Sequence, residues 1–286
     1  MKRKKLLAIL CISLSVVFLL ASVGVLIYRA DWGFRLWNAV RIYPKPDWEE
    51  LSISNTESIS LEALASEEGE SNDLLLLINS MYALPSGYLP MLAEYNGTLM
   101  HPQMINDYIA LRDAVQEKTG ERIYVSSDFR TSEEQAEILE NSEEGIAAQV
   151  GYSEHEAGLA LDVYVKGYGG KSFIKSRAGR EIARVCGKYG FIIRYPDGKQ
   201  EITGTPYEPW HLRYVGKPHA EIIMRCGLTL EEYLELLKPN TWFDTGDYLI
   251  GRFEPQKLGL PDIEIEDWML SPDNTGTYIV TVQKSR

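Results

Sequence analysis

One carboxylate inside an apolar segment limits what this chain can fold into. Asp162 interrupts the run Leu159-Ala160-Leu161-Asp162-Val163, which the pattern predicts to be a mostly buried strand. A lone ionised acid is costly to bury unless it is paired or binds a metal. A salt-bridged core acid meets that requirement, and for Asp162 taken alone it is the better interpretation. The other residues with metal-binding side chains decide between a salt bridge and a metal site for Asp162.

Histidine is scarce, which narrows the choice of a metal-binding partner for Asp162. The chain has four histidines, and two of them stand in settings that favour other roles. His101 precedes a proline at a helix start, where a capping or surface role is expected, and His219 follows Pro218 in an apparently exposed turn. His155 lies in a polar loop directly ahead of the strand that carries Asp162. This neighbourhood favours a metal site over a simple ion pair.

The segment Glu208-Pro209-Trp210-His211 supplies a second histidine and a second carboxylate. Residues three apart in a regular strand face opposite sides, but Pro209 cannot occupy a central position in a ladder. A bend or bulge here would turn Glu208 and His211 toward one centre. The alternative is a surface loop ahead of an edge strand, which leaves Trp210 and His211 unexplained.

These residues predict a site for one zinc ion. Two imidazoles and one carboxylate can hold zinc and leave its fourth position open for water, and His155, Asp162 and His211 form such a set. Zinc lowers the pKa of that water, and a carboxylate just outside the coordination shell, here Glu208, can act as the base. Arg130 would stabilise the oxyanion of a tetrahedral intermediate, although by itself it resembles a surface arginine at a strand end.

Helical and strand patterns are mixed along the body of the chain. Apolar residues at 104, 108, 111 and 115 predict an amphipathic helix that Gly120 ends, and a helix with a Ser or Thr cap starts near 131. Strands are expected at 122–126, 159–165, 191–195 and 210–215. The mixture predicts an α+β fold in which a small antiparallel sheet with flanking helices carries the zinc site.

The N-terminus predicts one transmembrane helix ahead of that fold. Basic residues at 2–5 precede an uncharged, mostly apolar run from Leu6 to Tyr28, which is long enough to span a bilayer. The basic cluster predicts a cytoplasmic N-terminus and an extracellular catalytic domain, in a single-pass protein of the cell membrane. A cleaved signal peptide is the alternative, but no clear cleavage site follows the run.

Composition divides the chain into four predicted segments. Residues 1–28 are the basic N-terminus and signal anchor, and 29–73 are a juxtamembrane segment followed by an acidic, Ser-rich tether. Residues 74–238 are the catalytic domain. Residues 239–286, rich in Gly, Pro and Asp, predict a small β-rich extension.

Charge and cysteine content restrict the partners and the covalent links. The net charge of −12 makes nucleic acid an unsuitable partner. Cys186 and Cys226 could pair in an oxidising exterior, but two separate buried thiols are at least as consistent with their helical settings.

Three motifs resemble the VanY-type D-alanyl-D-alanine carboxypeptidases, zinc enzymes related to the D-alanyl-D-alanine dipeptidases. The motifs are residues 126–130, 151–162 and 208–216, and the similarity covers roughly 74–238. The resemblance implies zinc on the three residues chosen above, with Glu208 as catalytic base and Arg130 as electrostatic stabiliser. It also implies substrate contacts for Ser153 and Gln135, and a role for Trp210 in shaping the pocket. The chain departs from the family pattern at 128–129 and 156–157, without losing a ligand or the base.

The resemblance implies a membrane-anchored zinc D,D-carboxypeptidase. Such an enzyme removes the terminal D-Ala from peptidoglycan stem peptides or lipid-linked precursors, and in a glycopeptide-resistance setting this removes the target of vancomycin. An L,D-carboxypeptidase that trims tetrapeptide stems is the nearest alternative, because its motifs are almost the same. A non-catalytic wall-binding or sensor domain is a further alternative, but the complete set of site residues argues for activity.

Overall fold

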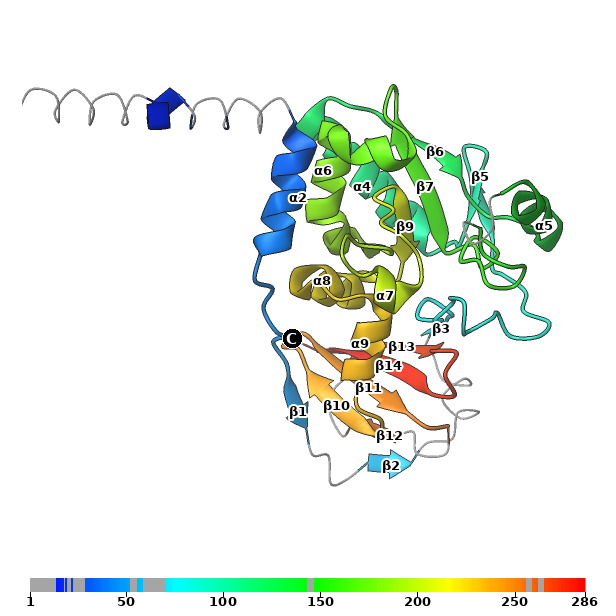
Figure 1. Cartoon of the computed structure of the whole chain (residues 1–286). Helices are drawn as coiled ribbons and strands as arrows, with labels where there is room; N and C mark the ends of the chain where they lie inside the picture. The colour runs from blue at the N-terminus through cyan, green and yellow to red at the C-terminus, as the bar shows by residue number, and fades with distance from the viewer. Residues whose placement is uncertain are drawn as a thin grey trace, which may run out of the picture.

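The computed structural model describes residues 14–17, 19, 22, 29–51, 56–58, 70–142, 147–255, 259–261 and 265–285. In this part of the chain two larger sheets lie near each other, and most helices surround the smaller of the two (Figure 1). The smaller sheet carries two of the predicted ligands, Asp162 and His211, and the larger one is built mainly from C-terminal residues. The α+β class with an antiparallel sheet at the site is therefore as predicted.

The smaller sheet has the strand order β6-β7-β9-β8, and each neighbouring pair is antiparallel. Its strands are β6 (Ile123–Ser127), β7 (Ala160–Val165), β8 (Phe191–Ile193) and β9 (His211–Tyr214). On β7, Leu161, Val163 and Val165 are buried, whereas Asp162 and Tyr164 are half-buried. Because side chains alternate along a strand, one face of the sheet packs on the core and the other can carry a site.

Helices cover the core side of this sheet. Helix α4 (Met104–Thr119) buries the residues whose spacing predicted it, and it ends at Gly120, whose φ of 71° suits glycine. It contacts α6 (Arg177–Val185), which continues into the 3-10 turn η2 (Cys186–Tyr189). The other helical elements of the body are α5 (Ser132–Asn141), η1 (Gly170–Lys175), α7 (Gln200–Thr203), α8 (Lys217–Cys226) and α9 (Leu230–Leu236).

A short hairpin lies at the end of β6. It consists of β4 (Ala93–Tyr95) and β5 (Thr98–Met100), joined by Asn96 and Gly97 with φ values of 50° and 77°, as expected for an Asn-Gly hairpin turn. The Phe129 N–H donates to the Leu99 carbonyl at 3.2 Å, and the Asp128 carboxylate accepts from the Leu99 N–H at 2.6 Å. The hairpin is thereby fixed to the loop that precedes α5.

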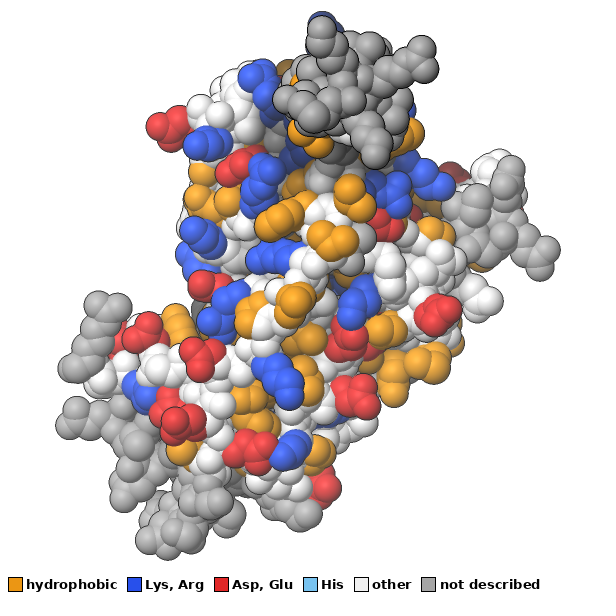
Figure 2. All heavy atoms as spheres, turned by 60° about the vertical axis from the view of Figure 1, so that its left-hand side comes forward, with side chains coloured by type: hydrophobic (Ala, Val, Ile, Leu, Met, Phe, Trp, Pro, Cys, Tyr) orange, Lys and Arg blue, Asp and Glu red, His pale blue; other side chains and the backbone are white. Residues whose placement is uncertain are grey.

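Helix α2 (Ala30–Val40) lies along the body beside α6 (Figure 1). Its Arg35 forms an ion pair with Asp197, with an N–O distance of 2.7 Å. The apolar side chains of Leu36 and Trp37 are exposed. Figure 2 shows basic and apolar side chains interspersed on the side of the molecule that it brings forward.

The predicted transmembrane helix is the part of the fold prediction that is wrong. In the residues that the structure describes, no helix is both long and apolar enough to cross a membrane. The prediction of a single-pass membrane protein with an extracellular catalytic domain rested on that helix, so it is not supported either. Most of the run from Leu6 to Tyr28, which carried this prediction through its length and lack of charge, lies outside the described residues.

The larger sheet has the strand order β1-β10-β11-β14-β13-β3, with only the last pair parallel. Its long strands come from the C-terminal residues, and its two edges come from the segment that was predicted as a tether. The strands are β1 (Glu49–Leu51), β3 (Glu70–Ser71), β10 (Thr241–Asp244), β11 (Tyr248–Phe253), β13 (Ile265–Pro272) and β14 (Tyr278–Lys284). Residues 56–58 (β2) pair with 259–261 (β12). The described parts of the tether therefore add strands, while its remainder lies outside the described residues.

His219 is buried, not exposed as its position after a proline suggested. Its ring nitrogens lie 2.7 Å from the Tyr233 hydroxyl and 2.9 Å from the Thr281 hydroxyl. The imidazole therefore links α8, α9 and the C-terminal strand β14. Cys186 and Cys226 are both buried free thiols, in agreement with the second of the two readings from sequence.

His219 should make the stability of the protein fall at mildly acidic pH. Burial lowers its pKa from the ordinary 6.5 to about 3, so below pH 6.5 the unfolded chain takes up a proton that the folded chain does not. The stabilisation is present above that pH and is lost as the pH falls. Between pH 7 and pH 5, wild-type protein should lose about 2 kcal/mol more unfolding free energy than His219→Gln. Urea titrations at both pH values measure this difference, and equal losses in both proteins would contradict it.

Candidate metal centre

Strand pairing places Asp162 and His211 side by side. The two residues are directly opposed in the β7–β9 register, and opposed residues of an antiparallel pair share one face of the sheet. The His211 Nδ1 atom lies 3.0 Å from the Asp162 Oδ1 atom. Two candidate ligands are thus fixed by backbone pairing, on the face opposite the apolar core.

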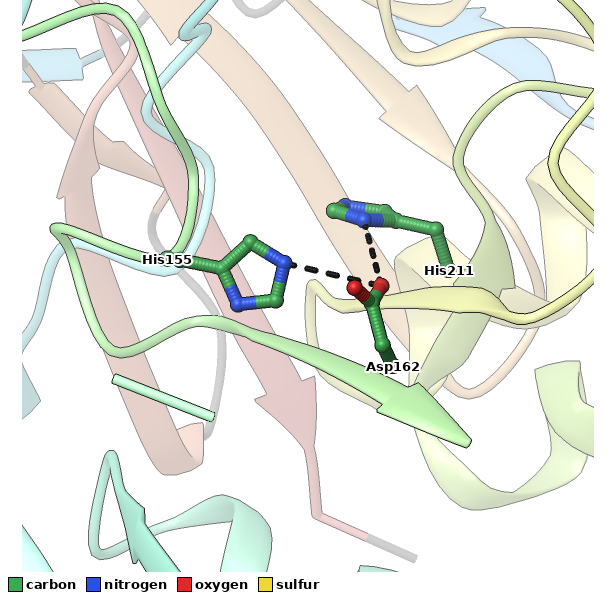
Figure 3. Close-up of side chains that lie close together, drawn as sticks. All are labelled: His155, Asp162 and His211. Carbon is green, nitrogen blue, oxygen red and sulfur yellow. Dashed lines mark hydrogen bonds and ion pairs between the residues drawn. The ribbon is translucent and has the colours of Figure 1, made fainter. Parts of the chain in front are cut away.

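His155 reaches the same point from the loop between α5 and β7. Its Nδ1 lies 2.7 Å from the Asp128 carbonyl oxygen, to which it donates, so the other nitrogen, Nε2, carries the lone pair. That nitrogen lies 3.5 Å from Asp162 Oδ1, and the two imidazole rings are edge to face at a 5.1 Å centroid distance. Figure 3 shows both rings directed at the one carboxylate.

The donor set fits a zinc ion. Ligand atoms of His155, Asp162 and His211 all lie within 4.8 Å of one another. The buried His155 Nε2 has no hydrogen-bond partner among the described residues, and a buried polar atom without a partner calls for an explanation such as an ion. Two nitrogens and one oxygen match a zinc site that keeps one position open. The three predicted ligands are therefore brought together in one cluster.

The charges around the cluster favour a cation. Burial opposes ionisation of Asp162, but the adjacent His155 and His211 rings outweigh it and hold the pKa of this carboxyl below its ordinary range. Burial also lowers the pKa of His155, which keeps it neutral. For His211, burial is outweighed by hydrogen bonds to Asp162 and Glu154, which raise its pKa to about 9. The same pair of carboxylates would stabilise a divalent cation.

Glu154 contacts the His211 ring on the side away from Asp162. Its Oε2 atom lies 3.1 Å from His211 Nε2, the ring nitrogen that faces away from Asp162. Its Oε1 atom accepts hydrogen bonds from Arg194 Nε and Arg213 Nη1, each at 2.6 Å, and all three side chains are fully buried. Burial opposes its ionisation, but the two guanidinium groups hold the pKa of Glu154 well below its ordinary value. A carboxylate of this kind fixes the orientation of a metal-binding imidazole.

Arg194 and Arg213 connect Glu154 to other segments of the chain. Arg213 Nη2 donates to the carbonyls of Leu74 and Leu76, and Arg194 Nη2 donates to the carbonyl of Ile78. Arg194 also forms an ion pair with Glu231 of α9 at 2.6 Å. From the sequence alone, no role was assigned to Glu154, Arg194 or Arg213. The signal was nonetheless present, because Arg194 directly follows the apolar strand β8 and Arg213 lies in β9, and a buried charge needs a partner.

Replacing Glu154 should weaken zinc binding. We expect Glu154→Gln to lower zinc affinity by about 10- to 100-fold, because the amide cannot supply the charge that orients His211. Glu156→Gln is the matched control, since Glu156 is a buried acid in the same loop that accepts from Ser132 Oγ and the Gly151 N–H instead. Competition with a chelator measures both affinities, and equal affinities of the two variants would contradict the role of Glu154.

The segment from Glu208 to His211 forms the bend that the proline predicted. The His211 N–H donates to the Glu208 carbonyl at 3.2 Å, and the Glu208 N–H donates to the Tyr195 carbonyl at 3.0 Å. Burial raises the pKa of the Glu208 carboxyl, and its electrostatic neighbours include His211, Asp162 and Arg130. Trp210 is half-buried against the core, and its carbonyl accepts from the Val163 N–H. Glu208 is therefore placed at the edge of the cluster.

Arg130 lies on another side of the same carboxylate. Its Nη2 atom is 3.5 Å from Asp162 Oδ2, and its other nitrogens donate to Ser127 Oγ and Gln135 Oε1, both at 3.0 Å. The Gln135 amide nitrogen donates to the Ala148 carbonyl at 2.7 Å, so both ends of this predicted substrate contact are held by the protein. Ser153 is buried at the start of the His155 turn.

Comparison with known proteins identifies relatives of this chain. A family model described as "VanY: D-alanyl-D-alanine carboxypeptidase" matches residues 97–217. The chain is 35% identical over 216 residues to a D-alanyl-D-alanine carboxypeptidase of Enterococcus faecium, an alignment that covers 68% of this chain and 69% of the relative. It is also 35% identical over 188 residues to the putative carboxypeptidase YodJ of Bacillus subtilis, covering 58% and 68%.

Solved structures are also similar to this chain. The D,D-pentapeptidase VanY from a VanB-type resistance cassette, in complex with Zn(II), is 34% identical with a TM-score of 0.51, covering 56% of this chain and 98% of that one. VanYB in complex with D-alanine-D-alanine is 33% identical with a TM-score of 0.52, covering 58% and 99%. The LdcB LD-carboxypeptidase is 29% identical with a TM-score of 0.54, covering 69% and 99%.

Proposed function

Because the chain belongs to the VanY family of D-alanyl-D-alanine carboxypeptidases, we propose that it is a zinc D,D-carboxypeptidase acting on peptidoglycan. Its substrates are stem peptides, or lipid-linked precursors of them, that end in D-Ala. The reaction is hydrolysis of the last peptide bond, which releases the terminal D-Ala. Removing this residue from stems ending in D-Ala-D-Ala would also remove the target of vancomycin.

One observation carries this proposal. The ligand atoms of His155, Asp162 and His211 lie within 4.8 Å of one another. Arg130 Nη2 lies 3.5 Å from Asp162 Oδ2, and Glu208 is an electrostatic neighbour of the same carboxylate. A ligand set, a base and a cation around one point are the parts that metal-assisted hydrolysis of a peptide bond requires. The relatives that bind Zn(II) and D-alanine-D-alanine support the choice of metal and substrate.

The residues would divide the reaction between them. When bound, zinc polarises water and the substrate carbonyl. Glu208 takes the proton from the attacking water as its oxygen bonds to the carbonyl carbon, and it later gives a proton to the leaving amine when the C–N bond breaks. Arg130 lies where it can oppose negative charge on the former carbonyl oxygen. The oxygen of the water thus becomes part of the new carboxylate, and D-Ala leaves as a free amino acid.

Arg130 should contribute strongly to turnover. We expect Arg130→Ala to lower kcat by about 10²- to 10³-fold, as observed when one preorganised donor to an oxyanion is lost. Zinc affinity should change much less, because Arg130 would not be a ligand. Steady-state kinetics with a stem pentapeptide measures the effect, and Arg177→Ala, at the start of α6 with an exposed side chain, is the control. Normal turnover by Arg130→Ala would show that Arg130 has no part in the reaction.

An L,D-carboxypeptidase is the second candidate, because the LdcB LD-carboxypeptidase covers 69% of this chain. Product analysis distinguishes the two. The full chain, loaded with zinc, is incubated with pentapeptide and with tetrapeptide stems, and the products are identified by mass. Loss of one residue from the pentapeptide alone supports our proposal, whereas cleavage of the tetrapeptide alone supports the second candidate. Cleavage of neither, with wall binding that Glu208→Gln retains, would favour a non-catalytic sensor.

The predicted division of the chain remains part of this proposal. Residues 74–238 would form the catalytic domain, and 239–286 a β-rich extension packed against it through His219 and Thr281. The predicted segment 29–73, a juxtamembrane part followed by an acidic tether, would then include the strands that border the extension.

A further inference from the structure

A groove of about 590 Å³ lies along the edge strand β6, apart from the candidate metal centre. Strand β6 is the terminal strand of the four-stranded sheet. The tip of the β4–β5 hairpin, one face of α4 and a side chain of β7 complete the walls, and these elements are neighbours in Figure 1. The side chains that dominate the lining are Tyr95, Tyr108, Tyr124, Tyr164, Arg112 and Arg122.

The tyrosines give the groove aromatic walls with polar ends. Tyr124 and Tyr164 are opposed in the β6–β7 register, and their rings stack with centroids 5.4 Å apart. Tyr124 is 37% exposed, and the Arg122 guanidinium lies 5.2 Å from its ring centroid. Such side chains suit a ligand that has apolar faces and hydrogen-bonding groups together.

The opposite wall is polar and nearly balanced in charge. Tyr108, Arg112 and Gln116 follow one another at helical spacing, so they line the same face of α4. Arg112 forms an ion pair with Asp113 at 2.7 Å and donates to the Tyr95 hydroxyl at 3.1 Å. The charge of Arg112 is therefore compensated within the groove, so this wall does not favour a polyanion.

The groove adjoins the candidate metal centre on the same sheet. Tyr164 follows Asp162 by two positions on β7, so both side chains lie on one face, separated by about 7 Å along the strand. Residues of an extended peptide span at most about 3.6 Å each. A stem peptide whose terminal bond lies at the metal centre is therefore long enough for its other end to reach the groove.

The shape of the strand edge disfavours an added peptide strand. The β6–β7 register shifts between Val125 and Ser127, and a bulge of this kind ends regular pairing. Beyond it, the hairpin already occupies the edge through the bond from the Phe129 N–H to the Leu99 carbonyl. The remaining edge, from Ile123 to Val125, is too short for a stable ladder.

We propose that this groove binds N-acetylated amino sugars of the glycan strand to which the stem peptide is attached. This proposal rests on the proposed function, because it concerns the same substrate. Pyranose rings would place their C–H faces on the tyrosines, and their hydroxyl and acetamide groups would bond to Gln116, Asn96 and Arg122. The enzyme would then distinguish stems on a glycan from free peptides.

Two measurements on the full, zinc-loaded chain test the proposal. The first is calorimetric titration with the uncharged tetramer of N-acetylglucosamine. The second compares KM for a pentapeptide attached to its disaccharide with KM for the free pentapeptide. Tyr124→Ala and Gln116→Ala change opposite walls, and Gln116→Ala also tests the groove at an exposed helical position that tolerates alanine. Tyr168→Ala is the matched control, because Tyr168 is a 40% exposed tyrosine beyond β7 that does not line the groove.

We expect wild-type protein to bind the tetramer and to show a lower KM for the glycan-linked substrate. Tyr124→Ala should raise that KM about tenfold, Gln116→Ala should raise it less, and neither should alter kinetics with the free pentapeptide. Equal KM values for the two wild-type substrates, absence of tetramer binding, or the same loss in Tyr168→Ala would overturn the proposal. Tetramer binding without hydrolysis of either peptide would instead refute the proposed function and leave the groove assignment standing.

Discussion

Removing zinc should abolish hydrolysis of the stem peptide, with a loss of about 10³-fold or more in kcat/KM, because the ion supplies several kcal/mol of charge stabilisation. Asp162→Ala should have the same effect in the presence of zinc. Asp162 is opposed to His211 in the β7–β9 register and lies within hydrogen-bonding distance of its ring. Losing it removes one proposed ligand and part of the negative field that favours a cation.

Metal content and activity must change together for this prediction to hold. Dialysis against a chelator should remove both, and added zinc should restore both in wild-type protein but not in Asp162→Ala. Asp113→Ala is the control, because Asp113 is an exposed acid on α4 outside the cluster. Full activity in metal-free protein would refute the zinc mechanism outright.

Replacing Glu208 should nearly eliminate turnover while leaving the metal in place. We expect Glu208→Gln to lower kcat by about 10²- to 10⁴-fold, the range for a general base, without a change in zinc content. Glu201→Gln is the matched control, since Glu201 is an exposed acid on the nearby α7. Loss of zinc from Glu208→Gln would make Glu208 a ligand instead of a base.

We expect the same residue to set the acidic limb of the pH profile. Burial raises the pKa of Glu208 above its ordinary 4.5, and a base must be ionised to accept a proton. Turnover should therefore fall with decreasing pH through a midpoint above 4.5. The residual activity of Glu208→Gln should lack this limb, and an identical limb in that variant would assign it to another group.

The sequence was most informative where a residue type is costly in its predicted setting and therefore requires a particular partner or backbone shape. A carboxylate in an apolar strand required partners, the few histidines limited them to His155 and His211, and Pro209 required the bend that turns Glu208 and His211 together. The helix at 104–119 and the antiparallel sheet followed from residue spacing in the same way. Each of these inferences started from a local pattern around the residue concerned.

Features that depend on distant contacts were missed. The role of Glu154 becomes visible only when β8 and β9 bring Arg194 and Arg213 to it. His219 looked exposed because its partners, Tyr233 and Thr281, lie elsewhere in the chain. The strands at 49–51 and 70–71 read as a tether because pairing with C-terminal strands leaves no local pattern.

The ion pair between Arg194 and Glu231 determines the shortest fragment that can be expected to fold. All the proposed ligands and the proposed base precede residue 217, where the family match ends. A fragment that stops there omits α9, which supplies Glu231, and leaves the buried Arg194 without one of its two carboxylate partners. Breaking a buried pair costs about 3–5 kcal/mol, which is a large part of the stability of a typical domain. We therefore expect the smallest folded catalytic unit to extend at least through Leu236, the last residue of α9, so that the charge of Arg194 stays balanced.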